Sequence, residues 1–504
     1  METIKTEIKE NKMGTAPVGG LIAGMAVPAM FSMMVQALYN IVDSFFVAKI
    51  SQEALTAVSL AFPIQSLLVA FGVGTGVGIN SLVSRRLGEG RRKEATCAAT
   101  HGLLLGLVNW ALFALFGLFF ARQFIEGFST DPTVIADGTR FVQIVSIFSF
   151  GVFVEINVEK TLQATGNMIY PMVFQLIGAL TSLILDPIFI FGWFGVPAMG
   201  VPGAAIANVL AQCIAMCVSL TVLMKKKHEI EVNFRGFRLD LKIVRDIYAV
   251  GIPTIIMQSI ASVMVMGMNL ILVRFTDTAV ALFGIYFKLQ SFVFMPVFGL
   301  MQGMMPILGY NYGAKKQSRM VQAIRIGLVV SALIMAAGVL LFWVMPARLL
   351  LIFEASPEMV QIGVPALQII SLCFVPAAVG ITFSTVFQAL GKGIYSLAIS
   401  LLRQMIVLLP AAHLLAHISL NSVWYAFPIA EIFSLAASLL CSATCIVAAS
   451  APCRNPLPLR RYVWPRTHGI NKNVSVVIQK GLVSCCETKA LLPIPCRIPL
   501  AESY

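Results

Sequence analysis

An internal repeat constrains the fold of this chain more than any other feature. Residues 28 to 171 recur without a gap 225 positions further on. Pro28 returns as Pro253, and the run Gln163-Ala164-Thr165-Gly166 returns as Gln388-Ala389-Leu390-Gly391. In a polytopic membrane chain, two such halves are typical of a transporter, because similar bundles can rock about a site between them.

The composition places both halves in a membrane. The chain is 58% hydrophobic and 12% charged, which leaves too few polar residues to cover a soluble protein of 504 residues. Apolar runs of roughly 18 residues or more predict transmembrane helices. We expect an all-α integral membrane protein with twelve transmembrane helices, in two six-helix lobes related by a parallel internal repeat. The spans run over residues 17–48, 54–84, 95–121, 134–159, 168–191 and 201–224, then 244–273, 279–309, 320–345, 358–386, 394–416 and 421–449.

Basic residues assign the loops to sides of the membrane. They gather after the second, sixth and eighth spans, with Arg85 and Arg86, Lys225 to Lys227, and Lys315 and Lys316 as examples. The positive-inside rule therefore predicts that both termini are cytoplasmic. The expected domains are a cytoplasmic tail (1–16), a first lobe (17–224), a basic linker (225–243), a second lobe (244–449) and an atypical C-terminal tail (450–504).

The net charge of +13 does not indicate a nucleic-acid partner. Basic cytoplasmic loops facing anionic lipid account for it, together with the tail. That tail is rich in Cys, Pro and basic residues, which is typical either of disorder or of an altered reading frame. No Gly-Lys-Ser/Thr phosphate loop is present, so energy from bound ATP is not indicated and no cofactor is expected.

Ionisable groups inside lipid are costly and therefore functional candidates. The predicted spans contain Asp43, Glu155, Asp186, Lys288, Arg403 and Glu431. Asp43 and Asp186 each lie about six residues, or roughly 9 Å, from the outer end of a span. If they meet, one carboxyl holds a proton, or a cation such as Na+ is bound between them. The alternative is that each carboxylate only joins a hydrogen-bond network between helices.

Neighbouring polar residues support a cation-coupling site in the first lobe. Tyr39 lies one helical turn before Asp43, and Ser182 lies one turn before Asp186. Asn157 and Asn208 complete the candidate set, or form ordinary interhelical hydrogen bonds. In the second half Met268 and Ala411 replace the two aspartates, so the acidic site belongs to the first lobe alone.

Two further features are candidates for function. Pro28 removes a backbone hydrogen bond inside the first span and predicts either a hinge or a static kink. In the second lobe Lys288 and Glu431 lie at similar depth and could pair, with Gln290 nearby. Such a pair is either structural or part of a binding site. For Arg403 and Glu155, nearer the cytoplasmic side, snorkelling or pairing with a loop is expected.

These residues resemble the multidrug and toxic compound extrusion family, in particular its bacterial branch of staphylococcal and DNA-damage-inducible exporters. The resembling segments are Tyr39-Asn40-Ile41-Val42-Asp43, Leu185-Asp186-Pro187, Gly203-Ala204-Ala205-Ile206-Ala207, Phe287-Lys288-Leu289-Gln290 and the two glutamine-containing runs of the repeat. The resemblance implies two lobes in a V and an exporter that exchanges H+ or Na+ for drug-like small molecules. It also implies a bacterial inner membrane as the location, and a first-lobe cation site at Asp43 and Asp186, with Tyr39, Asn157 and Asn208.

Two other functions are possible for a polytopic membrane chain, and the sequence fits each of them less well. A lipid-linked saccharide flippase would line its cavity with several Arg or Lys for a pyrophosphate, and Lys288 and Arg403 are few for that role. A membrane-embedded polyprenyl-phosphate transferase would need Asp or His clustered on a cytoplasmic loop, where this chain has mainly Lys and Arg. We therefore expect a drug:cation antiporter, active as a monomer in the lipid bilayer, and not an enzyme.

Overall fold

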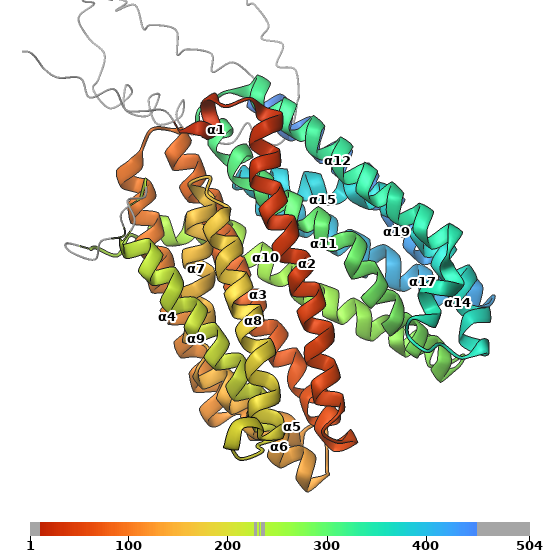
Figure 1. Ribbon diagram of the computed structural model, residues 1–504. Coiled ribbons are helices and arrows are strands. Elements are labelled where there is room, and N and C mark those ends of the chain that lie inside the picture. Colours follow the sequence, from red (N-terminus) through yellow and green to blue (C-terminus); the bar gives the residue numbers. More distant parts are fainter. Residues whose placement is uncertain (1–10, 226–228, 231, 233–236, 451–504) are drawn as a thin grey trace, which may run out of the picture. The chain divides into compact units, whose positions relative to one another are not determined.

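The computed structural model describes residues 11–225, 229–230, 232 and 237–450. Within these ranges, the side chains of residues 40, 41, 43–45, 47, 48, 52 and 443–450 lie outside the description. The C-terminal tail after residue 450 also lies outside it. Every regular element in the described part is helical (Figure 1).

The first half contains six long or paired helices. They are α2 (Val18–Ala48), α3 (Gln52–Gly88), α4 (Arg92–Phe119), the pair α6 (Pro132–Ile147) and α7 (Phe150–Ala164), α8 (Ile169–Phe191) and α9 (Val201–Lys225). Three short elements accompany them: α1 (Lys12–Thr15), α5 (Ala121–Glu126) and the 3₁₀ turn η1 (Trp193–Gly195).

The second half repeats this order. Its helices are α10 (Leu241–Leu272), α11 (Asp277–Gly313), α12 (Gln317–Val344), α13 (Pro346–Leu351), α14 (Pro357–Ser371), α15 (Phe374–Ala389), α16 (Gly393–Leu401), the π-helical segment η2 (Leu402–Leu408), α17 (Leu409–Leu415), α18 (Leu420–Val423) and α19 (Ala426–Ser450). Ten helices of the described chain are long and apolar enough to cross a membrane, and the number is twelve if each bent pair is one span. The expected fold class is confirmed.

The helix ends follow the repeat, because the residues that start and stop helices recur. Ser51 caps the start of α3 and Thr276, 225 positions later, caps the start of α11, each through its side-chain oxygen. Asp131 and Ser356 do the same for α6 and α14, and each is followed by a proline at the first helical position.

Two spans that the sequence predicted as single helices are bent. The axes of α6 and α7 differ by 44°, and those of α14 and α15 differ by 47°. Next to both breaks, a serine hydroxyl donates a hydrogen bond to a backbone carbonyl three residues earlier. Ser149 donates to the Ser146 carbonyl at 2.8 Å, and Ser371 donates to the Gln368 carbonyl at 2.9 Å. Such side-chain bonds compete with the helix ladder and favour a kink.

Repeated glycines bring the two halves together. Helix α3 packs against α10, and the repeat equivalents α11 and α2 pack against each other. A Cβ on Gly78 would lie 2.2 Å from the carbonyl oxygen of Ile247, and one on Gly303 would lie 2.7 Å from the Cα of Ala26. Because only glycine permits such backbone approach, the glycines shared by both halves build the contact between them.

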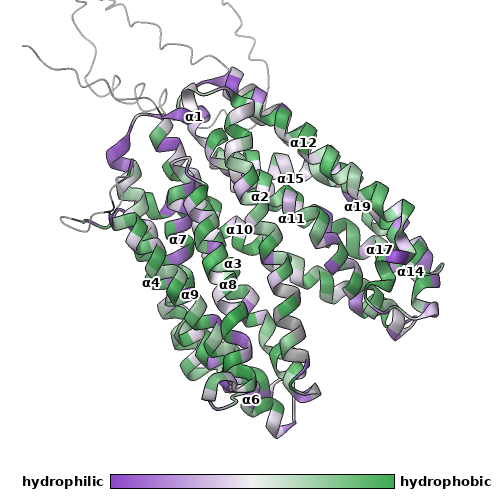
Figure 2. Cartoon of the chain, viewed as in Figure 1, coloured by the Kyte–Doolittle hydropathy of each residue, from purple (hydrophilic) through white to green (hydrophobic). Residues whose placement is uncertain are grey.

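The hydrophobic interior consists of one core shared by the two halves and further cores that each lie within one half. One core contains residues of both halves, among them Ile79, Leu87, Leu300 and Phe387. Three further cores each belong to one half: two in the first, around Phe141 and around Phe174, and one in the second, around Phe374. The shared core lies toward the end of the helices that carries Arg85, Arg86, Lys316 and Arg319, which we name the basic end. Figure 2 shows hydrophilic residues beside α1 at this end and hydrophobic stretches along the helices.

Candidate functional site

Three of the predicted site residues meet between α2, α8 and α9. The hydroxyl oxygens of Tyr39 and Ser182 are 3.0 Å apart, and the side-chain amide of Asn208 donates to the Tyr39 hydroxyl at 3.3 Å. Ser182 is buried, whereas Tyr39 and Asn208 are half-buried. Residues far apart in the chain thus form one polar cluster inside an apolar bundle.

Asp186 lies one helical turn after Ser182 on α8, and its side chain is only 1% exposed. Asp43 lies in α2 one turn after Tyr39, and its side chain lies outside the described residues. Pro28 is inside α2, which continues through it as one helix. The contact between α2 and α8 therefore brings together the two helices that carry the aspartates.

Local sequence explains why α9 approaches this site so closely. A Cβ on Gly203 would lie 2.3 Å from the carbonyl oxygen of Phe189 on α8, so only glycine fits there. Gly203 lies just over one helical turn before Asn208, which is thereby held against α8 and α2. The segment Gly203-Ala204-Ala205-Ile206-Ala207 thus packs α9 closely against α8 and thereby positions the side-chain amide of Asn208.

Asn157, also a predicted member of the set, makes its hydrogen bond elsewhere. Its amide donates to the Phe153 carbonyl at 2.7 Å on the same helix, and it lies against Gly106 of α4. Its side-chain oxygen is buried and has no hydrogen-bond partner among the described residues.

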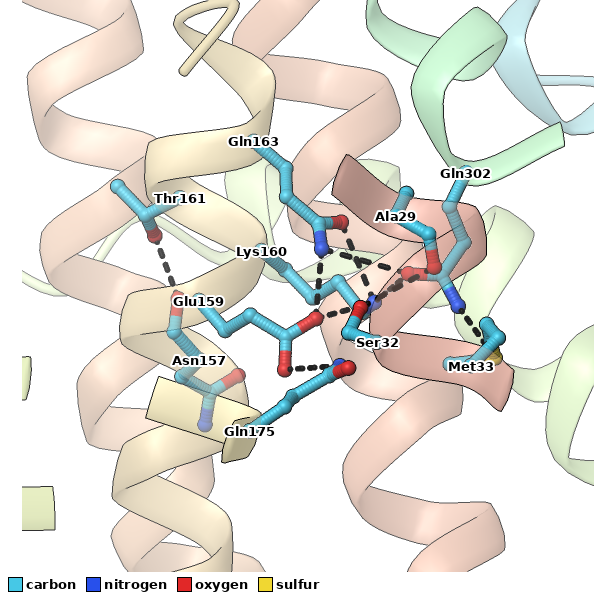
Figure 3. Close-up of polar contacts among 10 residues, drawn as sticks. All are labelled: Ala29, Ser32, Met33, Asn157, Glu159, Lys160, Thr161, Gln163, Gln175 and Gln302. Atoms are coloured by element: carbon cyan, nitrogen blue, oxygen red, sulfur yellow. Dashed lines mark hydrogen bonds and ion pairs between the residues drawn. The ribbon is translucent and has the colours of Figure 1, made fainter. Parts of the chain in front are cut away.

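A second polar cluster, shown in Figure 3, surrounds Lys160 near the end of α7. The Lys160 ammonium donates to Glu159 at 2.8 Å, to Gln163 at 3.2 Å and to Gln302 at 3.1 Å. Since an ammonium has three donors, all of them are used. Gln163 and Gln175 donate to the two oxygens of the Glu159 carboxylate, so the buried ion pair is hydrogen-bonded on both sides.

This cluster crosses from one half to the other. Glu159, Lys160 and Gln163 lie on α7, whereas Gln302 lies on α11 in the second half and also donates to the sulfur of Met33 on α2. A Cβ on Gly76 would lie 2.6 Å from the Lys160 side chain, so the α3 glycine makes room for the lysine.

The sequence analysis did not single out Glu159, the last residue of the predicted fourth span, and left Lys160 outside that span, which ends at residue 159. The helix continues to Ala164, and both side chains are buried. The signal that could have found them is Gly166, whose φ of +86° stops the helix as Gly391 does in the second half. Counting back from that glycine places Lys160 inside the span.

Glu155 lies one turn before Glu159 and is also buried. One of its carboxylate oxygens has no hydrogen-bond partner in the described part of the chain. The sequence predicted snorkelling or loop pairing for this residue, whereas the structure places it inside the bundle. Three buried carboxylates and one buried lysine therefore lie in the described part of the first half: Glu155, Glu159, Asp186 and Lys160.

In the second half the pair between Lys288 and Glu431 does not form. Lys288 is exposed, and its ammonium lies 5.9 Å from the centre of the Phe353 ring. Glu431 instead accepts from Arg403 at 3.3 Å. Arg403 lies in the π-helical segment, so the widened turn carries the partner of a buried carboxylate. Gln290 is half-buried on α11.

Two repeated helical halves that span a membrane, with buried ionisable and amide side chains between their helices, define a membrane transporter. The chain belongs to the MatE family, whose model matches residues 28–188 and 253–414, one match in each half. The resemblance seen in the sequence is confirmed.

Curated relatives carry transporter names. The chain is 25% identical over 369 residues to the multidrug export protein MepA of Staphylococcus haemolyticus, covering 73% of this chain and 80% of that one. It is also 25% identical over 429 residues to the FAD transporter of Shewanella oneidensis, covering 83% and 93%. These relatives are transporters, as expected for a chain that is not an enzyme.

Solved structures share the fold. A MATE family transporter of the MOP superfamily in an outward-facing conformation superposes with a TM-score of 0.83 at 22% identity, covering 88% of this chain and 98% of that chain. A MATE protein in a straight conformation gives the same TM-score at 23% identity, with 88% and 99% covered.

Proposed function

We propose that this protein is a secondary active antiporter that exports organic cations or lipophilic drugs in exchange for H+ or Na+. The observation that supports this best is Asp186, a carboxylate buried inside the first half one turn from the Tyr39–Ser182–Asn208 cluster. A carboxylate at membrane depth is costly and is retained where ions or substrates pass. The name of the staphylococcal relatives supports the substrate class.

The coupling cation is held by Asp43 and Asp186, either as a proton on one carboxyl or as Na+ between the two. Oxygen atoms of Tyr39 and Ser182 suit Na+ as hard ligands, and Asn208 orients the tyrosine hydroxyl. Asn157 supplies a further amide in the same half. Binding of the cation changes the charge of the site, and this difference biases the lobes toward one conformation.

The buried charge favours a cationic substrate over an anionic one. The described residues of the first half include three buried carboxylates and one buried lysine, and Glu159 already neutralises that lysine. A dinucleotide such as the one named for the Shewanella oneidensis relative would bring negative charge to this surface. We therefore place organic cations ahead of flavin nucleotides as substrates.

The proposed location is a bacterial inner membrane, with the basic end in the cytoplasm. Basic residues at one end of the bundle support this orientation through the positive-inside rule. Because one chain supplies both lobes, a monomer is sufficient for transport.

Substitution of the aspartates tests the proposal. Asp43→Asn and Asp186→Asn should each abolish dye export from everted vesicles without lowering purified yield, because an amide fills the same space but cannot exchange a charge. Asp137→Asn is the matched control, since Asp137 is half-buried on α6 outside the site. Transport at the parental rate in both site variants would remove the coupling site from Asp43 and Asp186.

A further inference from the structure

The segment Asn11–Ala16, named here the strap, contacts both halves at the basic end. It precedes α2 and contains the single turn α1, seen in red beside the green helices α11 and α12 in Figure 1. Its first residue caps the turn, because the Asn11 side-chain oxygen accepts from the Met13 amide at 2.8 Å.

The strap holds the first half through Asn11 and Met13. The Asn11 side-chain amide donates to the Thr165 carbonyl at 3.1 Å, and to Glu229 in the linker at 2.7 Å. Met13 is fully buried in the core that both halves share, and its side chain lies against Gly166.

The strap holds the second half through its backbone carbonyls. The Met13 carbonyl accepts from Asn311 at 3.1 Å and from Arg319 at 3.2 Å, and the Gly14 carbonyl accepts from Lys316 at 3.0 Å. Arg319 also donates to the Ala16 carbonyl. Carbonyls at the end of a helical turn need such donors, and basic side chains suit them best.

We propose that Asn11–Ala16 is a conformational strap that locks the two lobes together at the basic end and must release before that end can open. The chain runs from the strap through Pro17 directly into α2, so the strap stays with the first lobe. Release therefore breaks the bonds to Asn311, Lys316 and Arg319. This inference does not depend on the identity of the exported substrate or the coupling ion.

A buried reporter at the contact between the lobes can detect opening. Ser81 on α3 is fully buried and donates to the Gln388 carbonyl of the second half at 2.6 Å. Ser81→Cys, in a full-length chain whose other ten cysteines are replaced, would react with N-ethylmaleimide only when the lobes part there. Ser146→Cys, buried within the first half, reports on the fold itself.

Two changes should open the basic end. Arg319→Ala removes the donor to two strap carbonyls, and deletion of residues 2–16 removes the strap. Each should raise the labelling rate at position 81 about tenfold, which corresponds to the loss of about 1.4 kcal/mol. The controls are deletion of residues 2–10, which precede the strap, and Arg325→Ala, an exposed arginine on the same helix. Neither should change labelling.

Three results would overturn the proposal. Unchanged labelling at position 81 in Arg319→Ala and in the 2–16 deletion would show that the strap does not hold the lobes. An equal rise in labelling at positions 81 and 146 would show that the segment maintains the fold instead of one conformation. A rise in the 2–10 deletion that equals the rise in the 2–16 deletion would assign the effect to other residues. A failure of dye export by itself has no bearing on these labelling rates, so the proposed function is tested separately.

Discussion

Lys160 and Glu159 are neighbours in sequence, and both side chains are buried in the same hydrogen-bond network. Removing one partner of such a pair leaves the other charge without compensation in a low-dielectric interior. Replacing both together avoids that cost. The network also includes Gln302 of the second half, so the pair contributes to the contact between the lobes.

Lys160→Met should therefore lower the free energy of unfolding by about 3–5 kcal/mol. The double variant Lys160→Met, Glu159→Gln should recover most of the loss, because no unpaired charge remains. Chemical unfolding in mixed micelles measures both values. Lys288→Met is the control, since Lys288 is exposed and should change stability by less than about 0.5 kcal/mol. Additive effects of the two substitutions at 159 and 160 would argue against the buried pair.

At the scale of single helices, the distance to a neighbouring backbone decides which glycines are replaceable. Gly78 and Gly303 occupy equivalent positions on α3 and α11, and each contacts the backbone of a helix from the other half. Gly24 on α2 is also helical, but nothing lies within 4 Å of where its Cβ would be. The difference between these positions comes from packing and not from helix propensity.

Gly78→Ala and Gly303→Ala should each destabilise the protein by about 1–3 kcal/mol, because the added methyl group forces two backbones apart. Gly24→Ala should be neutral, or stabilising by up to about 1 kcal/mol, since alanine favours a helix. Thermal unfolding in detergent, with the three variants side by side, measures this. If Gly24→Ala were as damaging as the other two, the close approach of the helices would not be the cause.

The prolines of α2 and α10 lie at equivalent positions, but only α2 carries an aspartate of the proposed site. Pro28→Ala restores a backbone hydrogen bond and should slow export more than Pro253→Ala does. In α2, cation binding at Asp43 can favour one bend of the helix, whereas Met268 replaces this aspartate in α10. Export rates normalised to protein in the membrane test this. Equal loss in the two variants would contradict a coupling mechanism confined to the first lobe.

At the scale of the whole chain, the repeat and the hydropathy predicted the helices well. The ends of α3 and α11 both extend the predicted spans by a few residues, and they do so at equivalent positions. Hydropathy could not predict which helices touch, because a side chain that faces lipid is as apolar as one that faces another helix. The packing of α3 on α10 and of α2 on α11 therefore came from the structure.

The candidate site was predicted only in part, for a related reason. Helical spacing placed Tyr39 and Ser182 near the aspartates, and in the structure their hydroxyls contact each other directly, with Asn208 donating to Tyr39. Similar depth along two spans does not show that two side chains meet. Depth predicted a pair between Lys288 and Glu431, whereas Arg403 is the residue that contacts Glu431. Rotation about the helix axis decides such contacts, and residue counting does not supply it.

Transport by the purified protein in liposomes shows whether export is coupled to a cation gradient through Asp186. A fluorescent organic cation is followed while a pH gradient or a Na+ gradient is imposed separately across the membrane. We expect uphill transport of the dye with at least one of these gradients, and none in the Asp186→Asn variant. Uphill transport by Asp186→Asn at the parental rate, or transport by the parent that responds to neither gradient, would contradict cation-coupled export through the first lobe.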